Sequence, residues 1–245
     1  MKERHLTQIY SDYFQKFLTH TDKKKILLKE ITKRILNNNA SSLLDIGAGN
    51  GELAVPLSVL VINYVAIEQK PDYVKRLQDT SLKVINKSFP CEIIEKFDFI
   101  LASHSLPWEE KEYKLFIESA INLLTDKGLF LGVTFDDERS SWAGLLINCD
   151  LKSDQRRNGR LMHMEDWLSR YYLLKKTLIT TQVKTHSLDD IMASLAFVYS
   201  DGDAQKIEVF LNNNNVKEYI GQKNKDKYGY YFPFQHIFLE VNKLR

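Results

Sequence analysis

The chain has 245 residues, 44% of them hydrophobic and 27% charged, a balance typical of a globular domain with a sizeable core. Its formal net charge of +2 is too small to predict a broad nucleic-acid-binding surface. Two widely separated cysteines form no pairing motif, which favours a reducing, cytoplasmic location without disulfides or thiolate metal sites. No apolar run approaches the roughly 20 residues of a membrane span, so no membrane partner is expected.

Two helical patterns open the chain, one over the aromatic face from Tyr10 to Leu18 and one from Leu27 to Ile35. From residue 42 onwards, strand patterns alternate with helical patterns: "SLLDI", "GELAVPLSVL", "YVAI", "PDYVKRLQDT", "LKVI", "FDFILA", a helix around residues 113–124 and "LFLGVTF". After Phe135 the rhythm breaks, and residues 136–175 carry no strand signal. A strand in "TLITTQVKT", helices over 188–199 and 204–220, and a last strand "HIFLEV" complete the prediction.

This alternation predicts an α/β fold, a Rossmann-like, seven-stranded, mostly parallel sheet with helices on both faces and a small helical substrate cap. We expect a single domain over residues 1–245. Its parts would be an N-terminal helical cap (1–40), a cofactor-binding half (41–135), a cap insertion (136–175) and C-terminal strands and helices (176–245).

The stretch "LLDIGAGNGE" (43–52) places glycines at alternate positions directly after the first predicted strand. Ligands of parallel sheets bind at this edge, and glycines let the backbone approach them closely. Glu68 ends the second strand, 21 residues after Gly47, where a carboxylate can accept the ribose hydroxyls of an adenosine. Because Asp45 and Glu52 would repel a pyrophosphate, we favour a nucleoside that carries a cationic tail.

These residues resemble motif I and the following acidic residue of the class I S-adenosylmethionine-dependent methyltransferases. The resemblance implies S-adenosylmethionine as cofactor, with Asp45 near its methionine ammonium and Glu68 on its ribose. The full set of cofactor-binding residues that we expect is Asp45, Gly47, Ala48, Gly49, Glu68, Gln69, Tyr73, Ser88, Phe89 and Ser103.

A narrower resemblance, to histamine N-methyltransferase-like proteins, rests on "YFQKFLTHTDKK", "FDFILASHSLPW" and "SSWAGLL". It implies that His104 faces both ligands, and we take His104 as the candidate catalytic base. The expected substrate-binding residues are Tyr13, Phe17, Asp22, His104, Trp108 and Trp142. The family's amine-binding carboxylate falls near Lys23, beside Asp22. A lysine repels an ammonium, so we predict that histamine is a poor substrate and that the acceptor is neutral or anionic.

The sequence therefore predicts a methyltransferase that acts on a small-molecule substrate, at nitrogen. A protein or peptide methyltransferase, a small-molecule O-methyltransferase and a non-catalytic cofactor-binding protein stay open as alternatives. No metal is expected, because Asp136 and Asp137 are an isolated carboxylate pair and the six histidines lack ligand spacing. Residues 102–105, "ASHS", lack the motif of nucleic-acid base methylases, so nucleic acid is not the expected partner. Composition leaves monomer and dimer open.

Overall fold

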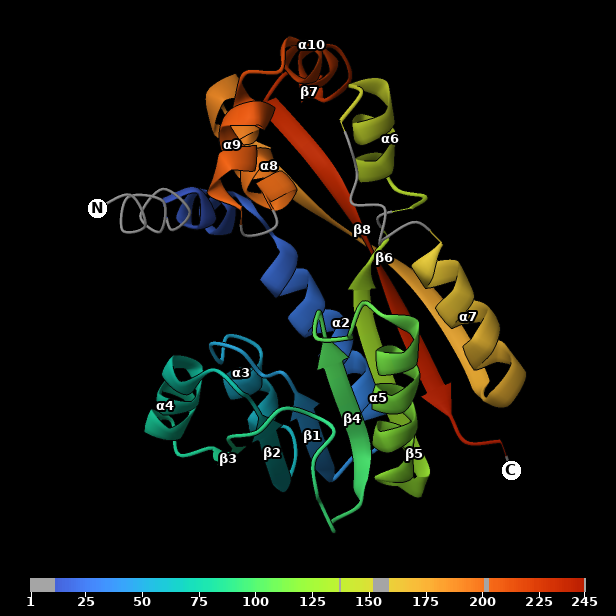
Figure 1. The fold of residues 1–245 in the computed structure, drawn as a ribbon. Helices are drawn as coiled ribbons and strands as arrows, with labels where there is room; N and C mark the ends of the chain where they lie inside the picture. The colour runs from blue at the N-terminus through green and yellow to red at the C-terminus, as the bar shows by residue number, and fades with distance from the viewer. Residues whose placement is uncertain (1–11, 137, 152–158, 201–202, 245) are drawn as a thin grey trace. The chain divides into compact units, whose positions relative to one another are not determined.

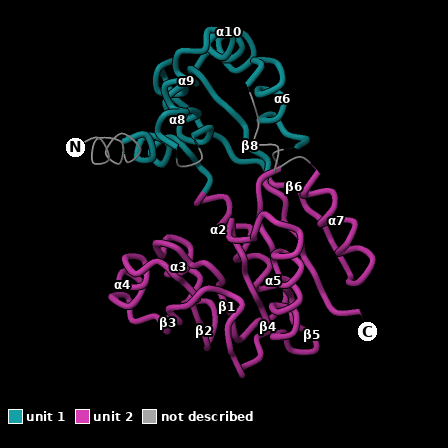
Figure 2. The backbone as a smooth tube through the Cα atoms, in the orientation of Figure 1, with its two compact units in different colours: residues 1–23, 137–153, 180–235 teal, residues 24–136, 154–179, 236–245 magenta. Residues whose placement is uncertain are grey.

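The computed structural model describes residues 12–136, 138–151, 159–200 and 203–244 (Figure 1). The chain forms two compact units (Figure 2). Unit 1 comprises residues 1–23, 137–153 and 180–235, and unit 2 comprises residues 24–136, 154–179 and 236–245. The four segments expected from the sequence have other boundaries, and that division stays a prediction.

In the described part of the chain, the strands form one eight-stranded sheet in the order β3-β2-β1-β4-β5-β8-β6, with β7 paired to β8. They are β1 (Ser42–Ile46), β2 (Asn63–Ile67), β3 (Lys83–Ile85), β4 (Phe97–Ser103), β5 (Leu124–Phe135), β6 (Leu173–Thr185), β7 (Lys225–Asp226) and β8 (Gly229–Asn242). Strands β1 to β5 are parallel, and β8 runs antiparallel to β5. The Rossmann-like α/β prediction is confirmed, with eight strands rather than seven. The two charged residues of β7 are too short a run to give a strand pattern.

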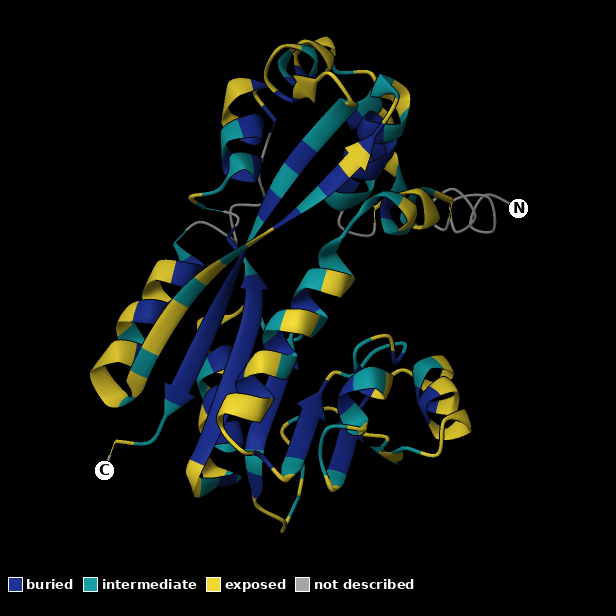
Figure 3. Ribbon diagram, turned by 180° about the vertical axis from the view of Figure 1, so that it is seen from behind, coloured by how far each residue is buried: buried dark blue, intermediate teal, exposed yellow. Residues whose placement is uncertain are grey.

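Helices cover both faces of the sheet in unit 2. They are α2 (Lys23–Asn37), α3 (Ala54–Ser58), α4 (Pro71–Asp79), α5 (Glu110–Asn122) and α7 (Arg160–Tyr171). Phe99 and Leu101 of β4 pack with α2, α3 and α4, whereas Ile100 and Ala102 pack with α5 and α7. Because each face is covered, the central strands are almost wholly apolar and buried (Figure 3).

Unit 1 contains helical residues 12–20 and four further helices among its described residues: α6 (Ser141–Asn148), α8 (Leu188–Ser200), α9 (Ala204–Leu211) and α10 (Asn214–Lys223). The single helix predicted over 204–220 is wrong. Helix α9 ends at Leu211 and α10 begins at Asn214. The Asn213 side chain accepts a hydrogen bond from the Val216 N–H at 3.2 Å, which caps α10. No helix in the described ranges has the length and hydrophobicity needed to cross a bilayer.

Candidate active site

The turn after β1 has a backbone that favours glycine. Gly47 and Gly49 have φ angles of +78° and +61°. A Cβ atom on Gly47 would lie 2.5 Å from the Ser105 Cβ, so no larger residue fits there without a shift. A Cβ on Gly49 would meet no described atom within 4 Å. The turn is therefore tightly packed at Gly47 and leaves open space at Gly49.

Glu68 follows β2 and is held by two backbone N–H groups of unit 2. The Gly49 N–H donates to Oε2 at 2.9 Å, and the Lys70 N–H donates to Oε1 at 2.8 Å. The residue is only 6% exposed. An ionised carboxylate has about four lone-pair positions, so each oxygen can still accept a ligand hydroxyl. The Glu68 carboxylate is thus held in one orientation and has lone pairs left for a pair of neighbouring hydroxyl groups, such as those of a ribose.

Asp45 lies buried in β1 beneath the turn. The Tyr64 hydroxyl of β2 donates to its Oδ2 at 2.6 Å. Burial raises the pKa of Asp45 to about 6; the Tyr64 hydrogen bond lowers it and the nearby Glu68 charge raises it. Burial, together with the Asp45 charge, holds the pKa of Tyr64 well above its usual value. Asp45 therefore changes its protonation state easily near pH 6.

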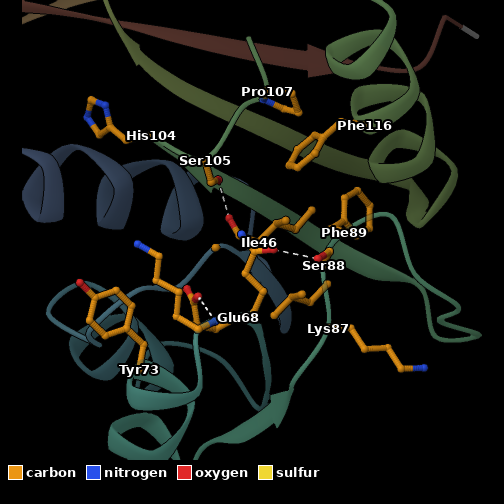
Figure 4. A pocket seen from close by; sticks show the side chains of 14 residues that line it. Ile46, Glu68, Tyr73, Lys87, Ser88, Phe89, His104, Ser105, Pro107 and Phe116 are labelled. Atoms are coloured by element: carbon orange, nitrogen blue, oxygen red, sulfur yellow. Dashed lines mark hydrogen bonds between the residues drawn. The ribbon is translucent and has the colours of Figure 1, made fainter. Parts of the chain in front are cut away.

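A cavity of about 430 Å³ opens at the carboxyl ends of β1, β2 and β4 (Figure 4). This volume lies in the range of small-molecule sites. Seven predicted site residues line it: Gly47, Glu68, Gln69, Tyr73, Ser88, Phe89 and His104. Sequence reasoning missed the other seven: Ile46, Ile67, Lys70, Lys87, Ser105, Pro107 and Phe116. Most of these adjoin a predicted residue in the chain, but Phe116 had the pattern of an ordinary core position on its helix.

Four other predicted cofactor residues lie one or two positions in the chain from a lining residue but do not line the cavity themselves: Asp45, Ala48, Gly49 and Ser103. Among them, Gly49 donates its N–H to Glu68, and Asp45 accepts a hydrogen bond from Tyr64 below the turn.

The lining combines polar groups with aromatic walls. The Ser88 hydroxyl donates to the Gln69 side-chain oxygen at 2.7 Å. The Phe89 ring packs edge-on against Phe116 with centroids 4.9 Å apart. A carboxylate, an amide and flat apolar rings together fit a sugar that is joined to an aromatic base, so the residues present suit the expected nucleoside.

His104 stands at the rim of this cavity, away from Lys87 (Figure 4). It directly follows β4 with a φ of +57°, and its N–H donates to the Val133 carbonyl at 2.8 Å. Its exposed ring lies 4.6 Å from the Phe135 ring and 5.3 Å from the ring of the fully buried His236, centroid to centroid. The imidazole is therefore supported on one side by two rings and open on another.

The predicted substrate residues fall in both units. In unit 2, the Trp108 ring lies under the Arg160 guanidinium, 4.0 Å from ring centroid to guanidinium carbon. In unit 1, Phe17 and Trp142 are each 6% exposed within an aromatic cluster. The Asp22 carboxylate accepts from the Gln182 N–H at 2.7 Å. Tyr13 lies in the helical residues 12–20, with the Lys16 ammonium 5.8 Å from its ring centroid. The contact of these residues with a substrate stays a prediction.

Of the two adjacent carboxylates Asp136 and Asp137, the structure describes only the first. Asp136 is buried directly after β5, while Asp137 lies outside the described residues. Over the described ranges, no cluster of three or more His, Cys, Asp or Glu side chains is arranged to hold a metal ion.

Comparison with known proteins gives a family. A family model described as a methyltransferase domain matches residues 6–193 of this chain. No curated protein matches the chain significantly.

Solved structures share the fold. The YcgJ protein from Bacillus subtilis is similar with a TM-score of 0.61 at 14% identity, over 89% of this chain and 98% of that one. The plantazolicin methyltransferase BpumL, solved with SAH and a pentazolic desmethylPZN analog, gives 0.54 at 12% identity, over 99% and 91%. A putative methyltransferase (BH2331) from Bacillus halodurans gives 0.54 at 15%, over 83% and 93%.

Proposed function

Because the chain belongs to the methyltransferase-domain family, as a class I S-adenosylmethionine-dependent enzyme, we propose that it methylates a small molecule at nitrogen in the cavity beside β1, β2 and β4. When bound, S-adenosylmethionine supplies an electrophilic methyl group on a sulfonium. The observation that carries the placement is Glu68, whose carboxylate is already oriented by two N–H groups and lines the cavity. The free thiols of Cys91 and Cys149 support a reducing compartment, the cytoplasm, as its location.

Three parts of the site divide the work of cofactor binding. Glu68 accepts the ribose hydroxyls, and the turn at Gly47 and Gly49 lets the chain come close to the ligand. The aromatic wall of Phe89 and Phe116 packs against the base. Asp45, held by Tyr64, favours a cationic methionine end by its charge.

His104 is the proposed base. With the cofactor bound, its sulfur would keep the electrons of the carbon–sulfur bond when the methyl group passes to the acceptor nitrogen, and that nitrogen would have to lose a proton. His104 takes this proton, because its ring is exposed at the rim of the cavity and its backbone is fixed by the Val133 carbonyl. A base that is already positioned lowers the entropy cost of the transfer.

The acceptor that we propose is neutral or anionic rather than a cationic amine such as histamine. The comparisons do not support the narrower resemblance to histamine N-methyltransferase. The Asp22 carboxylate, which would have to hold an ammonium, already accepts from the Gln182 N–H. Lys23 follows Asp22 directly in the chain and adds positive charge there.

The test is a methyl-transfer screen with S-adenosylmethionine labelled in its methyl group. Pools of amines, imidazoles, phenols and peptides are assayed with and without EDTA. We expect label in a nitrogen pool, poor turnover of histamine and the same rate in EDTA. Label in the peptide or phenol pool would instead support one of the alternatives, and loss of activity in EDTA would contradict metal independence.

The role of His104 is tested with the acceptor found in that screen. The variant His104→Gln should lose about 100-fold in kcat, the usual contribution of a general base, while its affinity for S-adenosylhomocysteine stays within about twofold. The control is His163→Gln, an exposed histidine on α7. Equal kcat values for the two variants would remove His104 from the chemistry.

A further inference from the structure

Arg160 is a buried arginine in unit 2 that the proposed chemistry does not use. It is the first residue of α7 and only 8% exposed. Burying a guanidinium is costly unless its N–H groups find partners. Its Nη1 donates to the Pro107 carbonyl at 2.9 Å, and its Nη2 donates to the Thr134 hydroxyl at 3.2 Å. Its planar group also covers the Trp108 ring, 4.0 Å from the centroid.

Two of these partners, Pro107 and Trp108, lie on the segment that forms the rim of the cavity. Residues 104–109 connect β4 to α5, and His104, Ser105 and Pro107 line the cavity (Figure 4). The segment is anchored near its start by two hydrogen bonds, from the His104 N–H to the Val133 carbonyl at 2.8 Å and from the Ser105 hydroxyl to the Ile46 carbonyl at 2.5 Å. Arg160 supplies the anchor at the other end. Thr134 fixes the guanidinium to β5, which is part of the sheet.

We propose that Arg160 is a positioning residue that holds the segment of residues 104–109 in place and thereby sets where His104 and Pro107 stand at the cavity. The planar guanidinium serves two acceptors and one ring at once. A lysine keeps the charge but has no planar fork of N–H groups to do so. The inference rests on the proposed function for its activity readout, but not for its structural readout.

The structural readout is fluorine NMR of protein labelled with 5-fluorotryptophan, which gives a signal for each of the three tryptophans. Trp108 reports on the segment and Trp167 on the fold of α7, where Arg160 also lies. In Arg160→Lys we expect the Trp108 signal to shift or broaden while the Trp167 signal stays. The matched control is Arg170→Lys, an exposed arginine in the last turn of α7, which should change neither signal.

The activity readout follows the same variants. Arg160→Lys should lower kcat about tenfold and weaken S-adenosylhomocysteine binding several-fold, as expected when an oriented group loses its support. If Arg160→Lys does not fold, Thr134→Val removes one hydrogen bond to the guanidinium and should give smaller changes in the same direction. Identical Trp108 signals and kcat values in Arg160→Lys and Arg170→Lys would overturn the inference. If the wild-type protein fails to bind S-adenosylhomocysteine, the proposed function is wrong, and the Trp108 signal still decides the role of Arg160.

Discussion

The turn after β1 in unit 2 and the aromatic cluster in unit 1 are stabilised in different ways. In the turn, backbone angles and N–H groups fix the geometry: Gly47 and Gly49 have positive φ angles, and Glu68 is oriented by the main chain. In the cluster, side chains pack on one another, and Trp142 lies with its ring centroid 5.7 Å from that of Phe234. A ligand site made from backbone tolerates few substitutions, whereas a packed cluster responds to changes of volume.

The largest effect on cofactor binding is expected when the turn itself is broken. In Gly47→Ala the new Cβ would lie 2.5 Å from the Ser105 Cβ, at a φ of +78° that disfavours alanine. Backbone strain alone costs about 1–3 kcal/mol. We expect no measurable S-adenosylmethionine binding by calorimetry.

The control for this variant is Gly221→Ala in α10 of unit 1. No described atom lies within 4 Å of the added Cβ, and alanine favours helix by up to about 1 kcal/mol. Its binding should therefore equal that of the wild type, and its melting temperature should not fall. Binding by Gly47→Ala within about twofold of the wild type would contradict the backbone account of the turn.

A smaller effect is expected from pH, through Asp45. Its pKa of about 6 in the free protein means that most of the carboxyl is protonated at pH 5. A cationic ligand favours the ionised form, so binding releases a proton and affinity rises with pH through 6 and is constant above it. We expect S-adenosylmethionine to bind roughly tenfold more weakly at pH 5 than at pH 7.

Two variants test whether Asp45 is the group responsible. Asp45→Asn should abolish this pH dependence, and His104→Gln should retain it, because His104 is not the group that the ligand charge selects. Calorimetry at pH 5, 6 and 7 measures both. A pH dependence that survives in Asp45→Asn would assign the titration to another residue.

The smallest effect on cofactor affinity is expected in the aromatic cluster. Trp142→Phe leaves space beside Phe210, Phe232 and Phe234 and should cost about 1–3 kcal/mol of unfolding free energy. The cavity residues all lie in unit 2, so the Kd of S-adenosylhomocysteine should not change. A raised KM for the acceptor with an unchanged cofactor Kd would support the predicted substrate role of Trp142. A raised cofactor Kd would contradict the expectation that this cluster does not affect cofactor binding.

The sequence predicted features that depend on short-range spacing. The choice of Gly47 and Glu68 follows directly from the strand–turn–strand pattern, and the Rossmann-like fold follows from the alternation of strands and helices.

The sequence did not predict the partners that the tertiary fold brings together. Tyr64 looked like an ordinary strand residue, although it bonds to Asp45, 19 positions away. Arg160 lay in a segment with mixed charges, and its partners Pro107 and Thr134 are 53 and 26 positions away. Only packing of the sheet and α7 creates that contact.

Binding of the nucleoside by Glu68 is the central proposal for this cavity. The direct measurement is a calorimetric titration of S-adenosylhomocysteine into wild-type protein, Glu68→Gln and the control Glu95→Gln, an exposed glutamate of unit 2 that pairs with Lys83. Charge-assisted hydrogen bonds to hydroxyls contribute about 2 kcal/mol, so Glu68→Gln should raise the Kd by roughly 30-fold. Glu95→Gln should bind like the wild type. Equal Kd values for a folded Glu68→Gln and the wild type would contradict the placement of the cofactor in this cavity.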